Sequence, residues 1–268
     1  MRSFASDNNS GVHPAIMEAL TRANQDHALG YGDDSWTKEA VRKIKEIFVA
    51  DCEPLFVFNG TGSNVIALQL LTRPYNSIIC AETAHVYVDE CGSPVKMTGC
   101  QIRPVATPDG KLTPELIVPY LHGFGDQHHS QPGAVYLSEC TELGTIYTPE
   151  ELRAITALAH QHGMRVHMDG ARIANACAAL GLPLKALTVD CGIDVLSFGG
   201  TKNGLMMGEC VIVFDDSLKV EARFVRKQSA QLASKMRYLS CQFTAYLTEE
   251  LWLKNATHAN AMAKRLYD

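Results

Sequence analysis

Seven short apolar runs, each followed by a segment long enough for a helix, constrain the fold of this chain more than any other feature. The runs are rich in Val, Ile and Phe and cover residues 55–58, 77–81, 101–105, 134–138, 165–169, 194–198 and 210–214. Apolar strands that alternate with helices indicate βαβ units, in which helices cover both faces of a parallel sheet. The sequence therefore predicts an α/β fold: a three-layer sandwich around a mostly parallel sheet of about seven strands.

Helix signals between the runs support this alternation. Residues 148–151 read Thr-Pro-Glu-Glu, which supplies an N-cap, a proline at the first helical position and a capping-box glutamate. Gly163 is placed to end that helix. Residues 113–115 open a second helix in the same way, and residues 35–49 carry apolar side chains at helical spacing.

The chain changes character after residue 215. Residues 217–268 contain neither glycine nor proline and are predicted to be mostly helical. The helical pattern of 251–268 continues to the last residue without a C-cap glycine. We therefore expect residues 1–240 to form a large domain with an N-terminal arm. Residues 241–268 would begin a helical connection to a small C-terminal domain that the chain lacks.

Charge and cysteine usage narrow the classes of ligand. The formal net charge of -5 is spread along the chain without a basic block, so we expect a small-molecule ligand and neither nucleic acid nor a membrane. The nine cysteines are scattered, and no two form a C-x-x-C pair. This usage favours reduced thiols in a cytoplasmic protein over a structural zinc site. The N-terminus also lacks the apolar core of a signal peptide.

A glycine-rich segment follows the first apolar run. Residues 59–64 read Asn-Gly-Thr-Gly-Ser-Asn and precede a helical pattern. Glycines at a helix N-terminus let backbone N–H groups approach an anion, which favours a phosphate site. The segment is neither a G-x-G-x-x-G nor a Walker A motif, so taken alone it is equally consistent with an ordinary turn.

Two charged residues follow other runs, and the carboxyl ends of parallel strands are where open α/β sheets bind ligands. Asp169 begins an Asp-Gly-Ala-Arg segment, where an acid is often simply a helix cap or a salt-bridge partner. Lys202 lies in a Gly-Gly-Thr-Lys-Asn-Gly segment, where the alternative is a solvated loop lysine. Burial or neighbouring cations lower a lysine pKa and make it nucleophilic, and glycines let a planar ligand lie close to the backbone.

The three segments together indicate one cofactor. Pyridoxal phosphate requires a phosphate anchor, an acid beside its pyridine nitrogen and an amine that forms an imine. We therefore expect Lys202 to hold this cofactor as a Schiff base and Asp169 to pair with its ring nitrogen. His85 lies four residues after the run 77–81, where its imidazole could stack on the ring or be an ordinary loop histidine.

These segments resemble the threonine aldolases, fold-type I pyridoxal-phosphate enzymes of the β-eliminating lyase superfamily. The resemblance covers nearly the whole chain and is carried by residues 4–8, 31–34, 59–64, 81–85, 167–172 and 197–204. It implies an aspartate aminotransferase-like large domain. It also implies a carbon–carbon lyase that cleaves a β-hydroxy-α-amino acid, such as threonine, allo-threonine or phenylserine, to glycine and an aldehyde.

The resemblance assigns roles to individual residues. Lys202, Asp169 and His85 keep the roles given above. The residues that would hold the phosphate are Gly60, Thr61 and Gly62. Arg172 would bind the cofactor or the substrate carboxylate, and Ser6 would also reach that carboxylate.

The base that removes the substrate hydroxyl proton has several candidates. His129 matches the spacing of a family histidine that faces this hydroxyl, and His128 is the competing assignment. His85 or a held water are the alternatives.

Residues from a second subunit are also implied. Tyr31 would come from the neighbouring subunit, and a partner's Arg237 or Lys235 would reach the phosphate. Shared sites of this kind imply a homodimer or homotetramer.

Two other functions of the chain stay open. One is a β-eliminating or desulfurising lyase that uses the same lysine and acid, and the other is an inactive binding or scaffold protein in which the two form a salt bridge.

Overall fold

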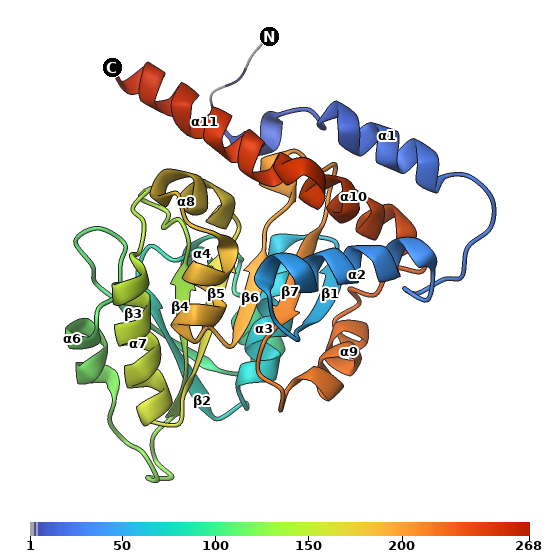
Figure 1. Cartoon of the computed structure of the whole chain (residues 1–268). Coiled ribbons are helices and arrows are strands. Elements are labelled where there is room, and N and C mark those ends of the chain that lie inside the picture. Colours follow the sequence, from blue (N-terminus) through green and yellow to red (C-terminus); the bar gives the residue numbers. More distant parts are fainter. Residues whose placement is uncertain (1–2, 4) are drawn as a thin grey trace.

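The computed structural model of the chain describes residues 3 and 5–268, so that Phe4, which belongs to one segment of the resemblance, lies outside the described residues. A seven-stranded sheet forms the middle layer, with helices on both of its faces (Figure 1). The predicted three-layer α/β sandwich is therefore confirmed. The strands are β1 (Glu53–Val57), β2 (Asn76–Ala81), β3 (Gln101–Val105), β4 (Gln131–Ser138), β5 (Arg165–Gly170), β6 (Val195–Phe198) and β7 (Glu209–Val213).

The sheet is mostly parallel, as predicted. Its spatial order is β1-β7-β6-β5-β4-β2-β3. β7 runs antiparallel to both of its neighbours, and all other pairings are parallel. The largest boundary difference is at β4, which begins at Gln131. Pro132 and Gly133 are weak strand formers, so the sequence pattern missed a part of the strand that still pairs with β2.

Helices cover the two faces of the sheet unequally. On one face lie α3 (Gly60–Leu71), α4 (His85–Val88), α5 (Ser93–Thr98) and α9 (Lys219–Gln228). On the other lie α2 (Ser35–Phe48), α6 (Pro114–Ile117), α7 (Pro149–Gln161), α8 (Ile173–Leu180) and α10 (Arg237–Leu247). Outside this second layer, α1 (Pro14–Ala23) packs on α10, and α11 (Leu251–Tyr267) packs on α8 (Figure 1).

Alternating side chains divide the core into two halves. In β6, Val195 faces the α3 side, whereas Leu196 and Phe198 face the α2 and α10 side. This alternation follows from the two-residue period of a strand. Phe198 meets Phe48 of α2 edge-on, with ring centroids 5.6 Å apart. All four β6 side chains are buried, which explains why this strand appears in the sequence as a continuous apolar run.

The predicted helix signals form as expected. The Thr148 side chain accepts the N–H of Glu151, and the Glu151 carboxylate accepts the N–H of Thr148, which makes a complete capping box at the start of α7. Gly163 adopts a φ of 69° just after that helix. The helix predicted from residue 113 is shorter than expected, because α6 ends at Ile117 and continues only as the 3-10 turn Val118–Tyr120.

The remaining short helices are 3-10 turns that lie in connecting segments: Asp7–Asn9, Leu184–Leu187, Val189–Cys191, Thr201–Asn203 and Thr248–Glu250. Within the described residues, no single helix has the length and apolar character needed to cross a membrane. The segments Ile173–Leu180 and Leu184–Cys191 have this length and apolar character only when they are counted together, and they are bent at the break between them. Both segments contribute buried side chains to the core.

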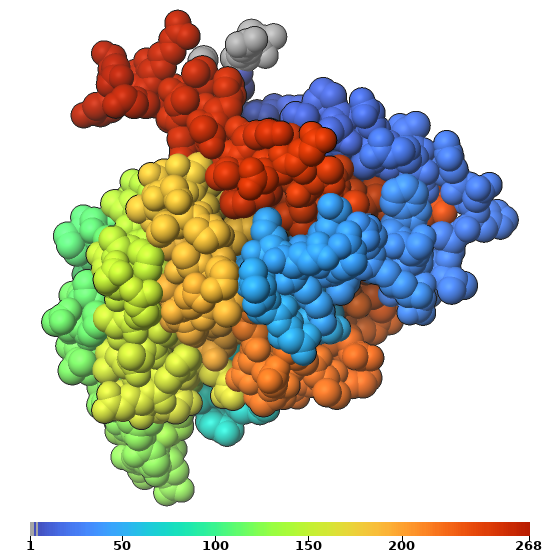
Figure 2. Space-filling view, viewed as in Figure 1, coloured from blue at the N-terminus to red at the C-terminus, as the bar shows by residue number. Residues whose placement is uncertain are grey.

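The strand directions decide where a ligand site can form. β4, β5 and β6 are parallel neighbours, so their carboxyl ends meet at one edge of the sheet. The loop before β4 lies at the opposite edge. Figure 2 shows this loop as the green projection at the bottom of the molecule, with the C-terminal part of α11 rising at the top.

Candidate active site

A cavity of about 280 Å³ lies at the carboxyl ends of the central strands. Six of the predicted site residues line it: Gly60, Thr61, His85, Asp169, Arg172 and Lys202. They come from four different strand-to-helix connections, so the fold brings together residues that are up to 142 positions apart in sequence, from Gly60 to Lys202. The volume is close to the lower end of the range of small-molecule pockets.

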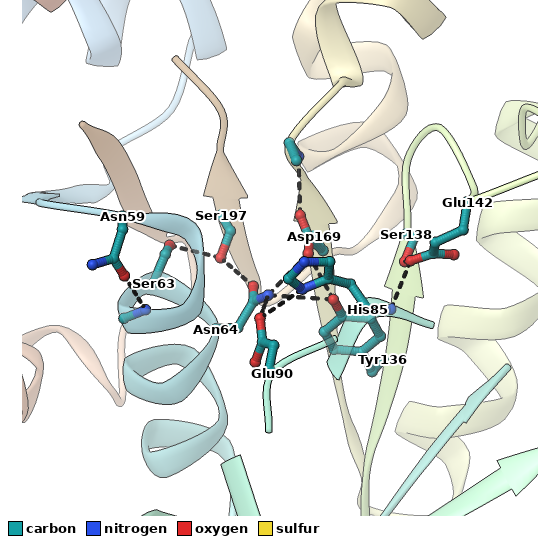
Figure 3. A network of polar contacts seen from close by, with 12 residues as sticks. Asn59, Ser63, Asn64, His85, Glu90, Tyr136, Ser138, Glu142, Asp169 and Ser197 are labelled. Carbon is teal, nitrogen blue, oxygen red and sulfur yellow. Dashed lines mark hydrogen bonds and ion pairs between the residues drawn. The ribbon is translucent and has the colours of Figure 1, made fainter. Parts of the chain in front are cut away.

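Asp169 is held as a carboxylate at the end of β5. The Tyr136 hydroxyl donates to its Oδ2 at 2.6 Å, the Asn64 amide donates to the same oxygen at 2.9 Å, and the N–H of Ala171 donates to Oδ1 at 3.0 Å (Figure 3). Burial by itself would raise the pKa of Asp169, but these hydrogen bonds outweigh it and leave the pKa below its ordinary value. A fixed negative charge therefore faces the cavity.

Asn64 is the centre of the polar network behind Asp169. Its Nδ2 also donates to Glu90 at 2.9 Å, and its Oδ1 accepts the Ser197 hydroxyl at 2.9 Å (Figure 3). His167 lies 3.0 Å from the same oxygen, and burial lowers its pKa to about 4, so its ring is neutral at pH 7. Asn64 had no predicted role, and the only signal for it in the sequence is a polar residue directly before the apolar run of residues 65–68 in α3.

His85 is oriented by Glu90, which the sequence reasoning also missed. His85 begins α4, and its Nδ1 lies 2.9 Å from Oε1 of the buried Glu90. This hydrogen bond raises the pKa of His85. Because the carboxylate accepts the Nδ1 proton, the neutral ring carries its lone pair on Nε2. Glu90 has no sequence signal of its own, since it is one acid in a polar loop.

The predicted phosphate cradle is the N-terminus of α3. Asn59 caps the helix, and its side chain accepts the N–H of Gly62 at 2.8 Å. The Gln231 side chain packs against Gly62 so closely that a Cβ there would lie 2.4 Å from its amide carbon. Gln231 also accepts the N–H of Phe58 at 3.0 Å. Gly60 and Thr61 line the cavity, so the N-terminus of α3, with its positive dipole end, opens into it and can bind an anion, whereas Gly62 is not among the lining residues.

The loop that carries Lys202 is fixed on both sides. A Cβ at Gly199 would lie 2.4 Å from the carbonyl oxygen of Ala171, so only glycine lets this loop approach the end of β5. After the lysine, the Asn203 amide donates to the Tyr246 hydroxyl at 2.6 Å and to the carbonyl of Trp252 at 2.9 Å. The position of the lysine is thus set by contacts of its neighbours Gly199 and Asn203, which do not involve the lysine side chain.

Arg172 lines the cavity but already has a carboxylate partner. Its Nε and Nη2 donate to the two oxygens of Asp7 at 2.7 and 3.1 Å. This bidentate pair ties the N-terminal arm to the site, and Asn8 of the same arm lines the cavity. Ser6 is not among the lining residues, because its hydroxyl caps the turn Asp7–Asn9 by accepting the N–H of Asn8.

His129 does not line this cavity of its own chain, so its role toward the substrate hydroxyl stays a prediction. It lies in the loop before β4, beside Asp126 and Arg103, together with His128. The eight residues of β4 separate this loop from the carboxyl edge, which is a distance of roughly 25 Å at about 3.3 Å per residue. The loop that carries His129 and the cavity of the same chain therefore lie at opposite ends of β4.

The residues assigned to a partner subunit also lie outside the cavity of their own chain. Tyr31 is 56% exposed, and the amine of Lys227 lies 5.5 Å from its ring centroid. Arg237 donates to the carbonyl of Asp26 at 3.1 Å. Lys235 lines a separate, mainly apolar pocket. Their roles toward a second subunit stay predictions.

Glu139 is a buried carboxyl that follows β4 and lies outside the cavity. Its Oε2 accepts the N–H of Tyr147 at 3.2 Å, and its Oε1 has no partner among the described residues. Burial raises its pKa from an ordinary value of 4.5 to about 8. Between these two values the unfolded chain releases this proton and the native chain keeps it, so rising pH favours unfolding.

We therefore expect the free energy of unfolding to fall between pH 5 and pH 8, by about 1.4 kcal/mol per pH unit from this carboxyl. The Glu139→Gln variant should lose that contribution and show a flatter pH dependence in denaturant unfolding. Glu150→Gln is the control, because Glu150 is exposed and its pKa is lowered by a backbone hydrogen bond. An equal slope in wild type and Glu139→Gln would contradict the assignment.

The fold and the site together define an α/β enzyme domain that binds its ligand at the strand carboxyl ends, with a lysine and an ionised aspartate in one cavity. A family model described as beta-eliminating lyase matches residues 3–268. The chain therefore belongs to the beta-eliminating lyase family.

Individual relatives agree with this family. The chain is 44% identical over 266 residues to a low specificity L-threonine aldolase of Pseudomonas sp. (strain NCIMB 10558), which covers 99% of this chain and 77% of that protein. The solved structure of Leishmania major threonine aldolase superimposes with a TM-score of 0.93 at 35% identity, over 98% of this chain and 77% of that one. A Thermus thermophilus aspartate aminotransferase shares the fold, with a TM-score of 0.74 at 15% identity over 96% and 71% of the two chains.

Proposed function

We propose that this chain is a pyridoxal-phosphate-dependent aldolase that cleaves a β-hydroxy-α-amino acid, such as threonine, allo-threonine or phenylserine, to glycine and an aldehyde. The observation that carries the proposal is the cavity that contains Lys202 together with Asp169, whose hydrogen bonds lower its pKa. Relatives named as low specificity L-threonine aldolases at 44% identity support the reaction type.

The residues present fit the cofactor chemically. A buried carboxylate whose pKa stays low favours a protonated pyridine nitrogen, and a primary amine on the same cavity can hold an aldehyde. The N-terminus of α3 supplies backbone N–H groups for a phosphate at Gly60 and Thr61. When bound, pyridoxal phosphate supplies an electron sink for the electrons of a broken bond at Cα.

His85 is the residue of this chain placed to move the hydroxyl proton. Its Nδ1 is engaged by Glu90, so Nε2 is the free acceptor on a ring that lines the cavity. An imidazole oriented by a carboxylate is a common general base near neutral pH. Stacking of the same ring on the cofactor is compatible with this role, because stacking uses the ring face and proton transfer uses the ring edge.

Arg172 is the cation available for the substrate carboxylate. Asp7 occupies Nε and Nη2, which leaves Nη1 as the guanidinium nitrogen without a hydrogen bond among the described residues. Asp7 thus fixes the plane of the guanidinium, and a substrate carboxylate would bind at its free side. We extend the proposal to a homodimer or homotetramer, because the exposed Tyr31 and the half-buried Arg237 lie outside their own cavity.

A β-eliminating activity is the second candidate, and the description of the matched family favours it. It would use the same lysine and aspartate but break a bond from Cβ to a heteroatom. The two reactions differ in their products, so one assay separates them.

The experiment incubates the purified protein and pyridoxal phosphate with threonine, and separately with serine and with cysteine. Glycine and acetaldehyde in equal amounts from threonine are the expected products. Pyruvate and ammonia from serine or cysteine, without glycine from threonine, would establish β-elimination instead. Absence of any product together with absence of cofactor uptake would refute both enzymatic proposals.

A further inference from the structure

Glu209 is an acid in the cavity for which the proposed reaction has no role so far. It is the first residue of β7, whose other side chains are apolar, and it is 7% exposed. β7 lies between β1 and β6, and the Glu209 side chain lines the cavity together with Lys202 and Asp169. A carboxyl at the end of a buried strand loses much of its hydration, which costs free energy. This cost points to a chemical function for the Glu209 carboxyl.

Glu209 is bound to the loop that carries the lysine. Its Oε2 accepts the N–H of Gly200 at 2.7 Å, two residues before Lys202. The Thr201 hydroxyl also stabilises its charged form, and this hydroxyl accepts the N–H of Gly208 at 3.1 Å. The segment before Lys202 is therefore anchored on the carboxyl, and Glu209 and Lys202 line the same cavity.

The pKa of Glu209 lies near neutral pH, because burial and hydrogen bonding shift it in opposite directions. Burial raises its pKa to about 7, against the hydrogen bonds from Gly200 and Thr201. The charged groups that face it are Asp169 of β5, which opposes its ionisation, and Lys202, which favours it. A carboxyl in this balance gains or loses a proton when the charge of its neighbour changes.

We propose that Glu209 exchanges a proton with the ε-amine of Lys202 each time the lysine is released or attached. This rests on the proposed function. When Lys202 is released as a free amine, the Glu209 carboxylic acid gives its proton to Nζ, which leaves a carboxylate and an ammonium ion. Before the lysine attaches again, the ammonium returns this proton to the carboxylate, and the neutral amine is the nucleophile. The transfer conserves charge within the pair and needs no further reactant.

The other carboxyls of the cavity are less suited to this exchange. Asp169 is held ionised by Tyr136 and Asn64. Glu142 directs its Oε1 to the N–H of His85 at 2.8 Å and to the Ser138 hydroxyl at 2.6 Å (Figure 3). It is therefore tied to the histidine side of the cavity, and it provides a matched control.

The test follows cofactor uptake by the apoprotein as the growth of visible absorbance, from pH 6 to pH 9. In wild type we expect the uptake rate to rise with a midpoint near pH 7, because the carboxylate form of Glu209 accepts the ammonium proton. In Glu209→Gln the rate at pH 7 should fall by about 100-fold, and the midpoint should move upward. The glutamine oxygen still accepts the N–H of Gly200, so the loop keeps its anchor.

Glu142→Gln should keep the wild-type midpoint, because Glu209 is intact in this variant. Any titration of the cofactor itself affects all variants equally. A wild-type profile in Glu209→Gln, or the same upward movement in Glu142→Gln, would overturn the proposal while leaving cofactor binding intact. Failure of wild type to develop any absorbance would instead refute the proposed function.

A second measurement needs no variant of Glu209. The infrared difference spectrum between loaded and apo wild type at pH 7 should contain a new protonated carboxyl band when Lys202 is attached. The same spectrum of Lys202→Ala should lack it. A wild-type spectrum without such a band would refute the exchange, whether or not Glu209→Gln folds.

Discussion

Replacement of Lys202 by alanine should abolish the visible absorbance of the protein with pyridoxal phosphate. It should also lower the rate of threonine cleavage by on the order of 10⁴-fold or more, the scale expected when a covalent catalytic group is removed. We expect the effect to be chemical and not structural, because the loop around the lysine is held by the close approach of Gly199 to Ala171 and by the side-chain hydrogen bonds of Asn203. The variant should therefore melt within a few degrees of wild type.

The measurement is an absorbance spectrum together with a product assay on the same preparations. Lys264→Ala is the control, since Lys264 is an exposed lysine of α11. It should keep both the absorbance and the activity. A wild-type spectrum in Lys202→Ala would show that another amine holds the cofactor, and the site would have to be assigned anew.

Replacement of Asp169 by asparagine should have the second largest effect, a loss of turnover of about 10²–10³-fold, typical of removing a charge preorganised for the transition state. The absorbance should persist, because Lys202 is intact. Asparagine keeps the shape of the side chain but removes the anion that favours a protonated ring nitrogen. Asp169→Asn should thus keep the absorbance and lose turnover, whereas Lys202→Ala should lose both. This difference distinguishes the role of the aspartate from that of the lysine.

Alanine at position 169 should add a cost in stability. It would leave the Tyr136 hydroxyl and the Asn64 amide without their acceptor, at roughly 1–3 kcal/mol for each buried group. Denaturant unfolding of the two variants measures this difference. Asp216→Asn, which alters an exposed acid, should match wild type in both assays. Full turnover in Asp169→Asn would exclude the electrostatic role.

Much of the fold was predictable because its signals are local. The apolar run of β6, the capping box of α7 and the amphipathic residues of α2 each depend on neighbours in sequence. The part of β4 before residue 134 was not predictable, since Pro132 and Gly133 pair with β2 only through the tertiary arrangement of the sheet.

The site was predictable where a residue directly follows a strand. Asp169 and Lys202 end up in one cavity because β5 and β6 are parallel neighbours. The place of His129 in the fold was not predictable, because its spacing is measured along the chain, whereas its distance from the cavity of the same chain is set by the length and direction of β4. Membership of the beta-eliminating lyase family and the fold agree with the resemblance seen in the sequence.

The sequence by itself thus determined the alternation of strands and helices and, through the polar residues at strand ends, the chemical type of the site. Only the tertiary structure decided how those residues are tuned. Asn64 beside Asp169 joins α3 to β5, and Glu209 joins β7 to the lysine loop, whereas Glu90 meets His85 through the local turn of the connection after β2. Burial and hydrogen bonding set each charge, and both depend on which distant segments the folded chain brings together.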